Sequence, residues 1–109
     1  MTIELPKPLA TYFAAKNRKD IDDMLSAFGE DAQVRDEGED LHGHAAIRDW
    51  MEKTTRKYGV TVEVTGLAGT EAQPIVSALV SGNFPGSPAT LHYHFTLDGR
   101  SIIRLETGA

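Results

Sequence analysis

The chain has 109 residues, which suffices for one folded domain with its own core, so residues 1–109 are expected to form a single domain. Its 11 Lys and Arg are scattered and its net charge is −5, which argues against a nucleic-acid-binding surface. No apolar run approaches the roughly 20 residues of a membrane span. Without cysteine there is no disulfide or zinc–thiolate site. The first residues lack a signal-peptide pattern, so a cytoplasmic location is expected.

Two helices are predicted in the first 30 residues. The first follows Pro6 and Pro8, where side chains recur at helical spacing: Leu9, Tyr12, Phe13 and Lys16. The second begins at the N-cap Asp20 and is expected to end at Gly29. Its apolar stripe consists of Ile21, Met24, Leu25 and Phe28. Both helices are therefore predicted to bury one face.

Residues 32–36 are predicted to form a strand, in which alternate side chains share a face. Ala32, Val34 and Asp36 then point the same way. If the two apolar residues face the core, Asp36 lies at the rim of an apolar space, where a carboxylate can serve in proton transfer. The alternative is that Asp36 only ends the strand and caps the next turn. Residues 37–43 are polar and contain glycine, which favours an exposed loop.

A third and longest helix is predicted from His44 to Tyr58, because side chains line up along one helical face and Gly59 suits a left-handed C-cap. The stripe consists of His44, Ile47, Trp50, Met51, Thr54 and Tyr58.

After Gly59 the apolar period changes from helical to two, which predicts strands at residues 60–67, 73–83, 90–97 and 101–106. Asp98 and Gly99 are typical of a hairpin turn. Strands joined by short turns pair antiparallel, and helices confined to the first half would cover one face of the sheet. The sequence thus predicts an α+β domain.

Several short motifs accompany this order of elements. They are Tyr12 with Asn17, Asp20 to Asp22, Phe28 with Asp31 and Ala32, and Gly43 with Ala46 and Ile47. Together they resemble the SnoaL-like, nuclear-transport-factor-2-like superfamily over nearly the whole chain, particularly its ketosteroid isomerase branch. The resemblance implies three N-terminal helices packed on a curved, mainly antiparallel sheet, forming a cone with an internal pocket. The superfamily hosts isomerases, cyclases, dehydratases and proteins without known chemistry, so the fold alone does not fix the activity.

In ketosteroid isomerases an Asp base moves a proton while a Tyr and a protonated Asp hold the enolate oxygen. The resemblance assigns the base to Asp36 and the first oxygen donor to Tyr12. For Tyr12, a core aromatic is the competing interpretation. The position of the protonated Asp, directly before His94, holds Tyr93, whose phenol can also donate a hydrogen bond but is longer. Glu37 replaces the proline usual after the base. These departures argue against steroid isomerisation itself.

The resemblance also implies which side chains touch a ligand. The third helix lines the pocket in this fold, so Trp50 and Met51 are candidates for substrate contacts, together with Phe95 and Phe28. Because the chain ends at Ala109, a smaller or more open pocket is expected.

Two His-x-His pairs, His42/His44 and His92/His94, suggest a metal site completed by Glu37, Glu39 or Asp40. The apolar residues of the same strand oppose this, because they turn His92 and His94 to the outer sheet face. In this superfamily that face often packs against a second subunit, so a homodimer is expected. Neither a metal nor a cofactor is predicted.

Two functions stay open. The first is a small-molecule enzyme, isomerase-like or polyketide-cyclase-like, that abstracts a proton next to a carbonyl of an apolar cyclic substrate. The second is a non-catalytic ligand-binding or dimerisation module of the same fold.

Overall fold

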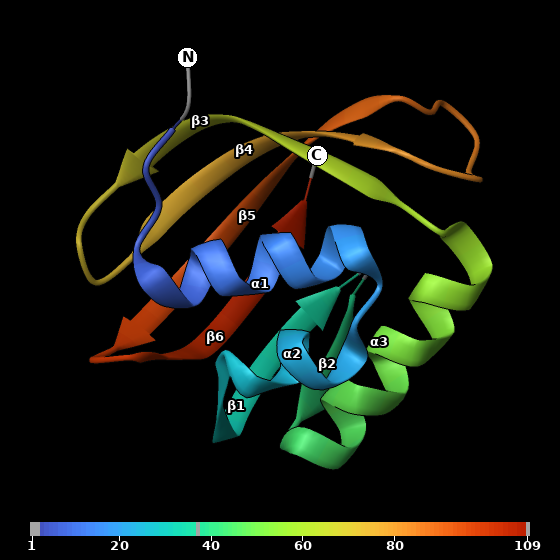
Figure 1. The fold of residues 1–109 in the computed structure, drawn as a ribbon. Helices are drawn as coiled ribbons and strands as arrows, with labels where there is room; N and C mark the ends of the chain where they lie inside the picture. Colours follow the sequence, from blue (N-terminus) through green and yellow to red (C-terminus); the bar gives the residue numbers. More distant parts are fainter. Residues whose placement is uncertain (1–2, 37, 109) are drawn as a thin grey trace.

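The computed structural model describes residues 3–36 and 38–108, which form three helices and six strands (Figure 1). In chain order these are α1 (Lys7–Arg18), α2 (Ile21–Ser26), β1 (Phe28–Asp36), β2 (Glu39–His42), α3 (His44–Tyr58), β3 (Thr61–Gly69), β4 (Pro74–Ser81), β5 (Ala89–Asp98) and β6 (Ser101–Gly108). None of the helices in these ranges is long and apolar enough to cross a membrane.

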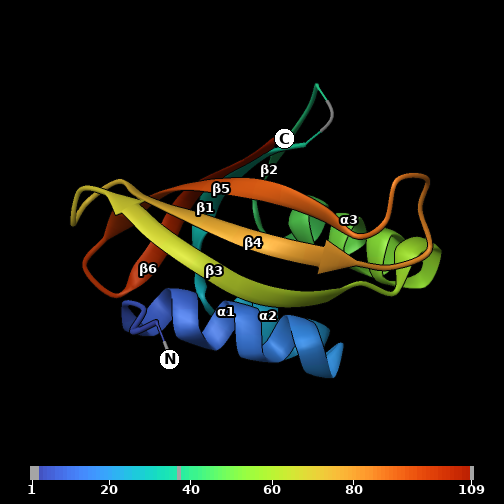
Figure 2. The ribbon, with the colours of Figure 1, turned by 90° about the horizontal axis from the view of Figure 1, so that it is seen from above.

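The six strands form one mixed sheet in the order β2-β1-β6-β5-β4-β3. All neighbouring pairs are antiparallel except β1 and β6, which run parallel. Figures 1 and 2 show the sheet curving over α1, with α2 and α3 on the same side. The predicted α+β class, with three N-terminal helices on a curved and mainly antiparallel sheet, is confirmed.

The predicted helix ends are confirmed at Asp20 and at Gly59. The Asp20 carboxylate accepts a hydrogen bond of 3.1 Å from the backbone N–H of Asp23, so it caps α2. Gly59 adopts the left-handed conformation with φ 55° and ends α3. The hairpin at Asp98 is also confirmed, since Asp98 pairs with Ser101 across a two-residue turn.

Several boundaries differ from the sequence prediction, and three of these differences change how the segments are interpreted. Helix α2 ends at Ser26, because Phe28 pairs with Ile102 of β6 and belongs to β1. The predicted loop at residues 37–43 contains strand β2, in which Asp40 pairs with Arg35. Glu37 itself lies outside the described residues. Strand β6 extends to Gly108, beyond the predicted end at residue 106.

The core contains a cluster of five aromatic rings between α1 and the sheet. The Tyr12 ring lies 5.5 Å from Phe28 and 6.0 Å from Phe95, and the Phe13 ring lies 5.1 Å from Tyr93, each measured between centroids in edge-to-face geometry. Pairs of this kind add roughly 0.5–1.5 kcal/mol each beyond their area burial. The cluster therefore fixes α1 firmly against β5.

Asn17 joins α1 to the edge strand β3. Its side-chain amide donates to the Val62 carbonyl at 2.9 Å and accepts from the Val62 N–H at 2.7 Å. The side chain thereby satisfies the outward backbone groups of an edge strand, which would otherwise lack a ladder partner. This contact explains the asparagine that follows Tyr12 by five positions.

Candidate active site

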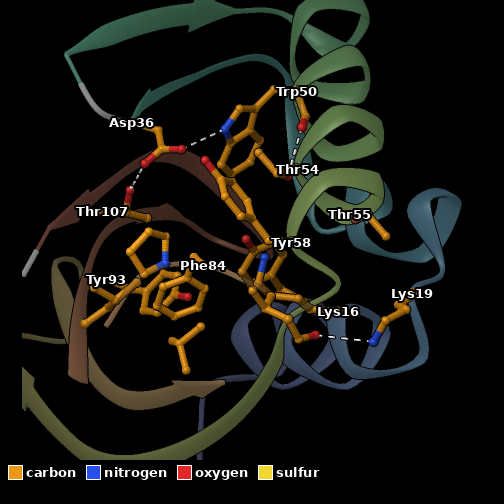
Figure 3. A pocket seen from close by; sticks show the side chains of 15 residues that line it. Lys16, Lys19, Asp36, Trp50, Thr54, Thr55, Tyr58, Phe84, Tyr93 and Thr107 are labelled. Atoms are coloured by element: carbon orange, nitrogen blue, oxygen red, sulfur yellow. Dashed lines mark hydrogen bonds between the residues drawn. The ribbon is translucent and has the colours of Figure 1, made fainter. Parts of the chain in front are cut away.

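A cavity of about 410 Å³ lies between α1, α3 and the concave face of the sheet. Figure 3 shows labelled side chains from both helices and from β1, β5 and β6 around this space. The polar and ionisable groups that line it are Tyr12, Lys16, Lys19, Asp36, Trp50, Thr54, Thr55, Tyr58, Tyr93 and Thr107. Apolar residues make up the rest of the wall: Val60, Val80, Phe84, Pro85 and Leu91. The volume suits one small organic molecule.

Asp36 projects from the end of β1 into this cavity. Its Oδ1 accepts a hydrogen bond of 2.6 Å from the Thr107 hydroxyl, and its Oδ2 accepts one of 2.9 Å from the Trp50 indole N–H (Figure 3). Ala32 and Val34 are buried on the same face, as the alternation predicted. The carboxylate is thus fixed in orientation, while each oxygen keeps a lone pair that can accept another proton donor.

The parallel pairing of β1 with β6 explains how Thr107 reaches Asp36. Val34 lies opposite Leu105 and Arg35 lies opposite Glu106, so the next step of the ladder carries Thr107 to Asp36. The two residues are 71 positions apart in the chain. The sequence prediction ended this strand at residue 106 and therefore did not include Thr107.

The two tyrosine rings are buried, with 1% of Tyr12 and 3% of Tyr93 exposed. Neither hydroxyl makes a hydrogen bond with a described residue. Every fully buried side-chain nitrogen or oxygen atom among these residues has a partner, so the two hydroxyls are not fully buried. They therefore contact the open space of the cavity that both residues line. Two phenol donors are directed at the same space as the Asp36 carboxylate.

The environment keeps both phenols protonated. Burial raises the pKa of Tyr12 well above its usual value, and the nearby Tyr93 and Asp36 raise it further. Burial also raises the pKa of Tyr93, with the Asp36 charge as the second cause. A phenol that keeps its proton can donate a hydrogen bond to a developing oxyanion.

Lys16 is a cavity residue that the sequence reasoning treated only as part of a helical stripe. It follows Tyr12 by one helical turn, and its Nζ lies 5.7 Å from the centroid of the Tyr12 ring. Burial lowers its pKa to about 8, an effect that Asp36 opposes and Lys19 reinforces. The spacing from Tyr12 was the available signal, because residues i and i+4 share a helical face.

Among the predicted substrate contacts, Trp50 lines the cavity, whereas Met51, Phe95 and Phe28 do not. These three side chains are buried in the core. Met51 is turned about 100° from Trp50 around the helix axis. Phe95 shares a strand face with Tyr93 but lies beneath α1, with its ring 5.9 Å from Phe13. In this structure, Met51, Phe95 and Phe28 support the cavity from behind its wall.

The histidines lie away from the cavity. His92 Nδ1 is 3.0 Å from the Ser77 hydroxyl, and the His44 ring is 2.9 Å from the Phe28 carbonyl. Within residues 3–36 and 38–108, no group of three or more His, Asp or Glu side chains is arranged to share a metal ion.

Two arginines make ion pairs outside the cavity. The Arg35 Nη1 lies 3.1 Å from the Asp40 carboxylate. Arg48 contacts Asp22 of α2 at 2.8 Å, because α3 packs beside α2. Both pairs are largely exposed, so each contributes little to stability.

The sequence model of the SnoaL-like domain matches residues 9–109. Among solved structures, a Sinorhizobium meliloti protein provisionally named a polyketide cyclase is 36% identical, with a TM-score of 0.91 and 95% of each chain covered. A Catenulispora acidiphila protein with a ketosteroid isomerase-like fold, solved in complex with trimethylamine, is 18% identical, with a TM-score of 0.84, 97% of this chain and 87% of the other covered.

A Pseudomonas putida protein, also provisionally named a polyketide cyclase, is 19% identical, with a TM-score of 0.81, and the match covers 99% of this chain and 92% of the other. The likeness to the two proteins below 25% identity shows the fold alone. The comparison with curated proteins gave no match.

Proposed function

This chain belongs to the SnoaL-like domain family, and we propose that it is an enzyme that removes a proton next to a carbonyl group of an apolar cyclic molecule. The observation that carries the proposal is that the Asp36 carboxylate and the two buried phenols, Tyr12 and Tyr93, line a single cavity. Asp36 is the base, and Tyr12 and Tyr93 are the donors to the carbonyl oxygen. The provisional cyclase name of the Sinorhizobium meliloti relative agrees with this class, because cyclisation of a polyketide begins with the same step.

In the proposed reaction, an Asp36 oxygen takes the proton from the carbon next to the carbonyl. The electron pair of that C–H bond forms a carbon–carbon double bond, and the carbonyl electrons move to oxygen. The hydroxyls of Tyr12 and Tyr93 donate to this enolate oxygen, where donors aimed in advance are most effective. The proton then returns to carbon from Asp36, either at the same carbon or at the far end of a conjugated system.

Two features support Asp36 as the base. Its hydrogen bonds to Thr107 and Trp50 hold the carboxylate in one orientation, which reduces the reorganisation needed before proton transfer. Asp36 also lines the cavity, so a molecule bound there can reach its carboxylate. Trp50 is the sole tryptophan of the chain, so its fluorescence can report ligand binding beside Asp36.

Exchange of the acidic hydrogens of 2-tetralone for deuterium in D₂O tests the proposal. Mass spectrometry would follow the protein-dependent exchange rate, and Asp36→Asn should lower it by roughly 10²–10⁴-fold, the usual contribution of a general base. Asp49→Asn is the matched control, because Asp49 lies on the exposed face of α3 and pairs with Lys53 at 3.0 Å. Equal exchange by the wild type and Asp36→Asn would overturn the proposed base.

Binding of 2-naphthol, followed by Trp50 fluorescence, gives a second measurement. This phenol has the shape of the enol of 2-tetralone, so a site built for the enolate should bind it. Asp36→Asn should bind it more tightly, because a neutral amide does not repel the phenolate form. If the wild type binds 2-naphthol but catalyses no exchange, the chain is a non-catalytic ligand-binding module.

A further inference from the structure

Lys16 brings a positive charge to the cavity that the two proposed oxygen donors also line. It lies in the last turn of α1, four residues after Tyr12, and it is partly buried against the ring of that tyrosine. A cation over a tyrosine face is attracted by the ring, which holds the ammonium group at the cavity wall. Burial of the aliphatic stem of Lys16 adds apolar contact.

The charged groups around Lys16 differ in whether they already have a hydrogen-bond partner within the protein. The ionisable side chains that line the same cavity are Tyr12 from α1, Lys19 directly after this helix, Asp36 from β1, Tyr58 from α3 and Tyr93 from β5. The Lys19 Nζ donates to the Val60 carbonyl at 3.3 Å, and both Asp36 oxygens already accept a hydrogen bond. Lys16 makes no hydrogen bond or ion pair with any described residue. Its ammonium group is therefore available to a ligand.

We propose that Lys16 binds a carboxylate on the ligand, so that the cavity takes an apolar ring compound with one negative charge. With two lysines and one aspartate on the wall, an added carboxylate would balance the charge of the cavity. An ion pair is stronger in this partly desolvated space than on an exposed surface. The inference deepens the proposed function, on which it rests, because it makes the substrate a cyclic keto acid rather than a neutral ketone.

A carboxylate bound beside Lys16 should change the protonation of this lysine. The pKa of Lys16 is about 8 in the folded chain, and a bound anion would raise it, because an opposite charge favours the ammonium form. Binding near pH 8 should therefore take up a fraction of a proton. Affinity for the anion should fall as the pH rises above about 8, while affinity for a neutral analogue should not.

Two probes of equal size test the proposal: 2-naphthoate, which carries a carboxylate, and 2-naphthamide, which is neutral. Fluorescence titration of Trp50 at pH 7 should show that the wild type binds naphthoate at least tenfold more tightly than naphthamide. Lys16→Met should remove this preference, whereas Lys16→Arg should retain it because the charge remains. Lys53→Met, on the exposed face of α3, is the matched control and should behave as the wild type.

Equal affinity of the wild type for the two probes would overturn the proposal, as would an unchanged preference in Lys16→Met. A preference lost in Lys19→Met but kept in Lys16→Met would also overturn it, because it would assign the carboxylate to the other lysine. The 2-tetralone assay uses a neutral ketone and depends on Asp36. Failure of exchange with an intact naphthoate preference would therefore overturn the catalytic proposal alone, and the converse result would overturn the Lys16 proposal alone.

Discussion

The five rings between α1 and the sheet divide into two groups that differ by one oxygen atom. Phe13, Phe28 and Phe95 contribute only packing, whereas Tyr12 and Tyr93 pack in the same cluster and also direct a hydroxyl at the cavity. The centroid distances across the two groups, 5.1 Å to 6.3 Å, show no boundary between them. The core therefore positions the candidate oxygen donors, and their hydroxyls could be removed without disturbing the packing that holds their rings.

The largest expected effect is on stability and concerns the phenylalanines, which contribute only packing. Phe95→Ala should lower the free energy of unfolding by about 3–5 kcal/mol, because it leaves a cavity beneath α1 among rings that cannot collapse around it. Urea denaturation measures the change. Tyr93→Phe is the control, since it keeps the ring and should change the unfolding free energy by less than about 0.5 kcal/mol. A loss of several kcal/mol in Tyr93→Phe would contradict the division into two groups.

The next largest effect is on the exchange rate and concerns the two tyrosine hydroxyls. Tyr12→Phe and Tyr93→Phe should each lower the rate of 2-tetralone exchange by roughly 10²–10³-fold, the usual cost of removing one oxyanion donor. The melting temperature should stay near that of the wild type. If one variant exchanges as fast as the wild type, that tyrosine fills the cavity wall without touching the reacting oxygen.

A third effect concerns Lys16 and the pH dependence of stability. Its pKa is about 8 in the folded chain and about 10.5 when unfolded, so between these values the unfolded state binds more protons. Lys16 therefore opposes folding most at low pH, and its contribution makes stability rise from pH 8 towards 10.5, by at most about 1.4 kcal/mol per pH unit. The raised pKa values of Tyr12 and Tyr93 act in the opposite direction, because they lower stability as the pH rises beyond about 10.

Urea denaturation between about pH 7.5 and 9.5 isolates the lysine. The unfolding free energy of the wild type minus that of Lys16→Met should become more positive as the pH rises. Lys53→Met provides the control for loss of a surface charge. A difference that stays constant over this range would show that burial does not lower the pKa of Lys16.

The sequence predicted the elements whose determinants are local. The stripe from His44 to Tyr58 and the C-cap at Gly59 define α3, and Asp98 with Gly99 defines the last hairpin, because spacing and turn chemistry act over a few residues. Alternation along β1 also predicted correctly that Asp36 shares a face with Ala32 and Val34.

The errors arise where distant pairing decides the structure. Phe28 continues the helical stripe of α2, yet pairing with Ile102 draws it into β1. The polar segment Glu39–His42 has little strand propensity and is a strand only because β1 lies beside it. The sequence did not identify Thr107 and Lys16 as residues of the site for the same reason. Thr107 is 71 positions from Asp36 in the chain and reaches it through the parallel pairing of β1 with β6, whereas Lys16 enters the cavity because α1 docks on the sheet.

The smallest expected effect tests whether the parallel ladder matters for chemistry. Thr107→Val keeps the size of the side chain but removes the hydrogen bond of 2.6 Å to Asp36 Oδ1, leaving the Trp50 indole as the other partner. A hydrogen bond of this kind contributes about 1 kcal/mol, so 2-tetralone exchange should fall about fivefold through a less fixed carboxylate. Thr65→Val makes the same change at an exposed position of β3 and should leave exchange unaltered. If Thr107→Val exchanges as fast as this control, Trp50 alone orients the base, and the link between β1 and β6 serves only the fold.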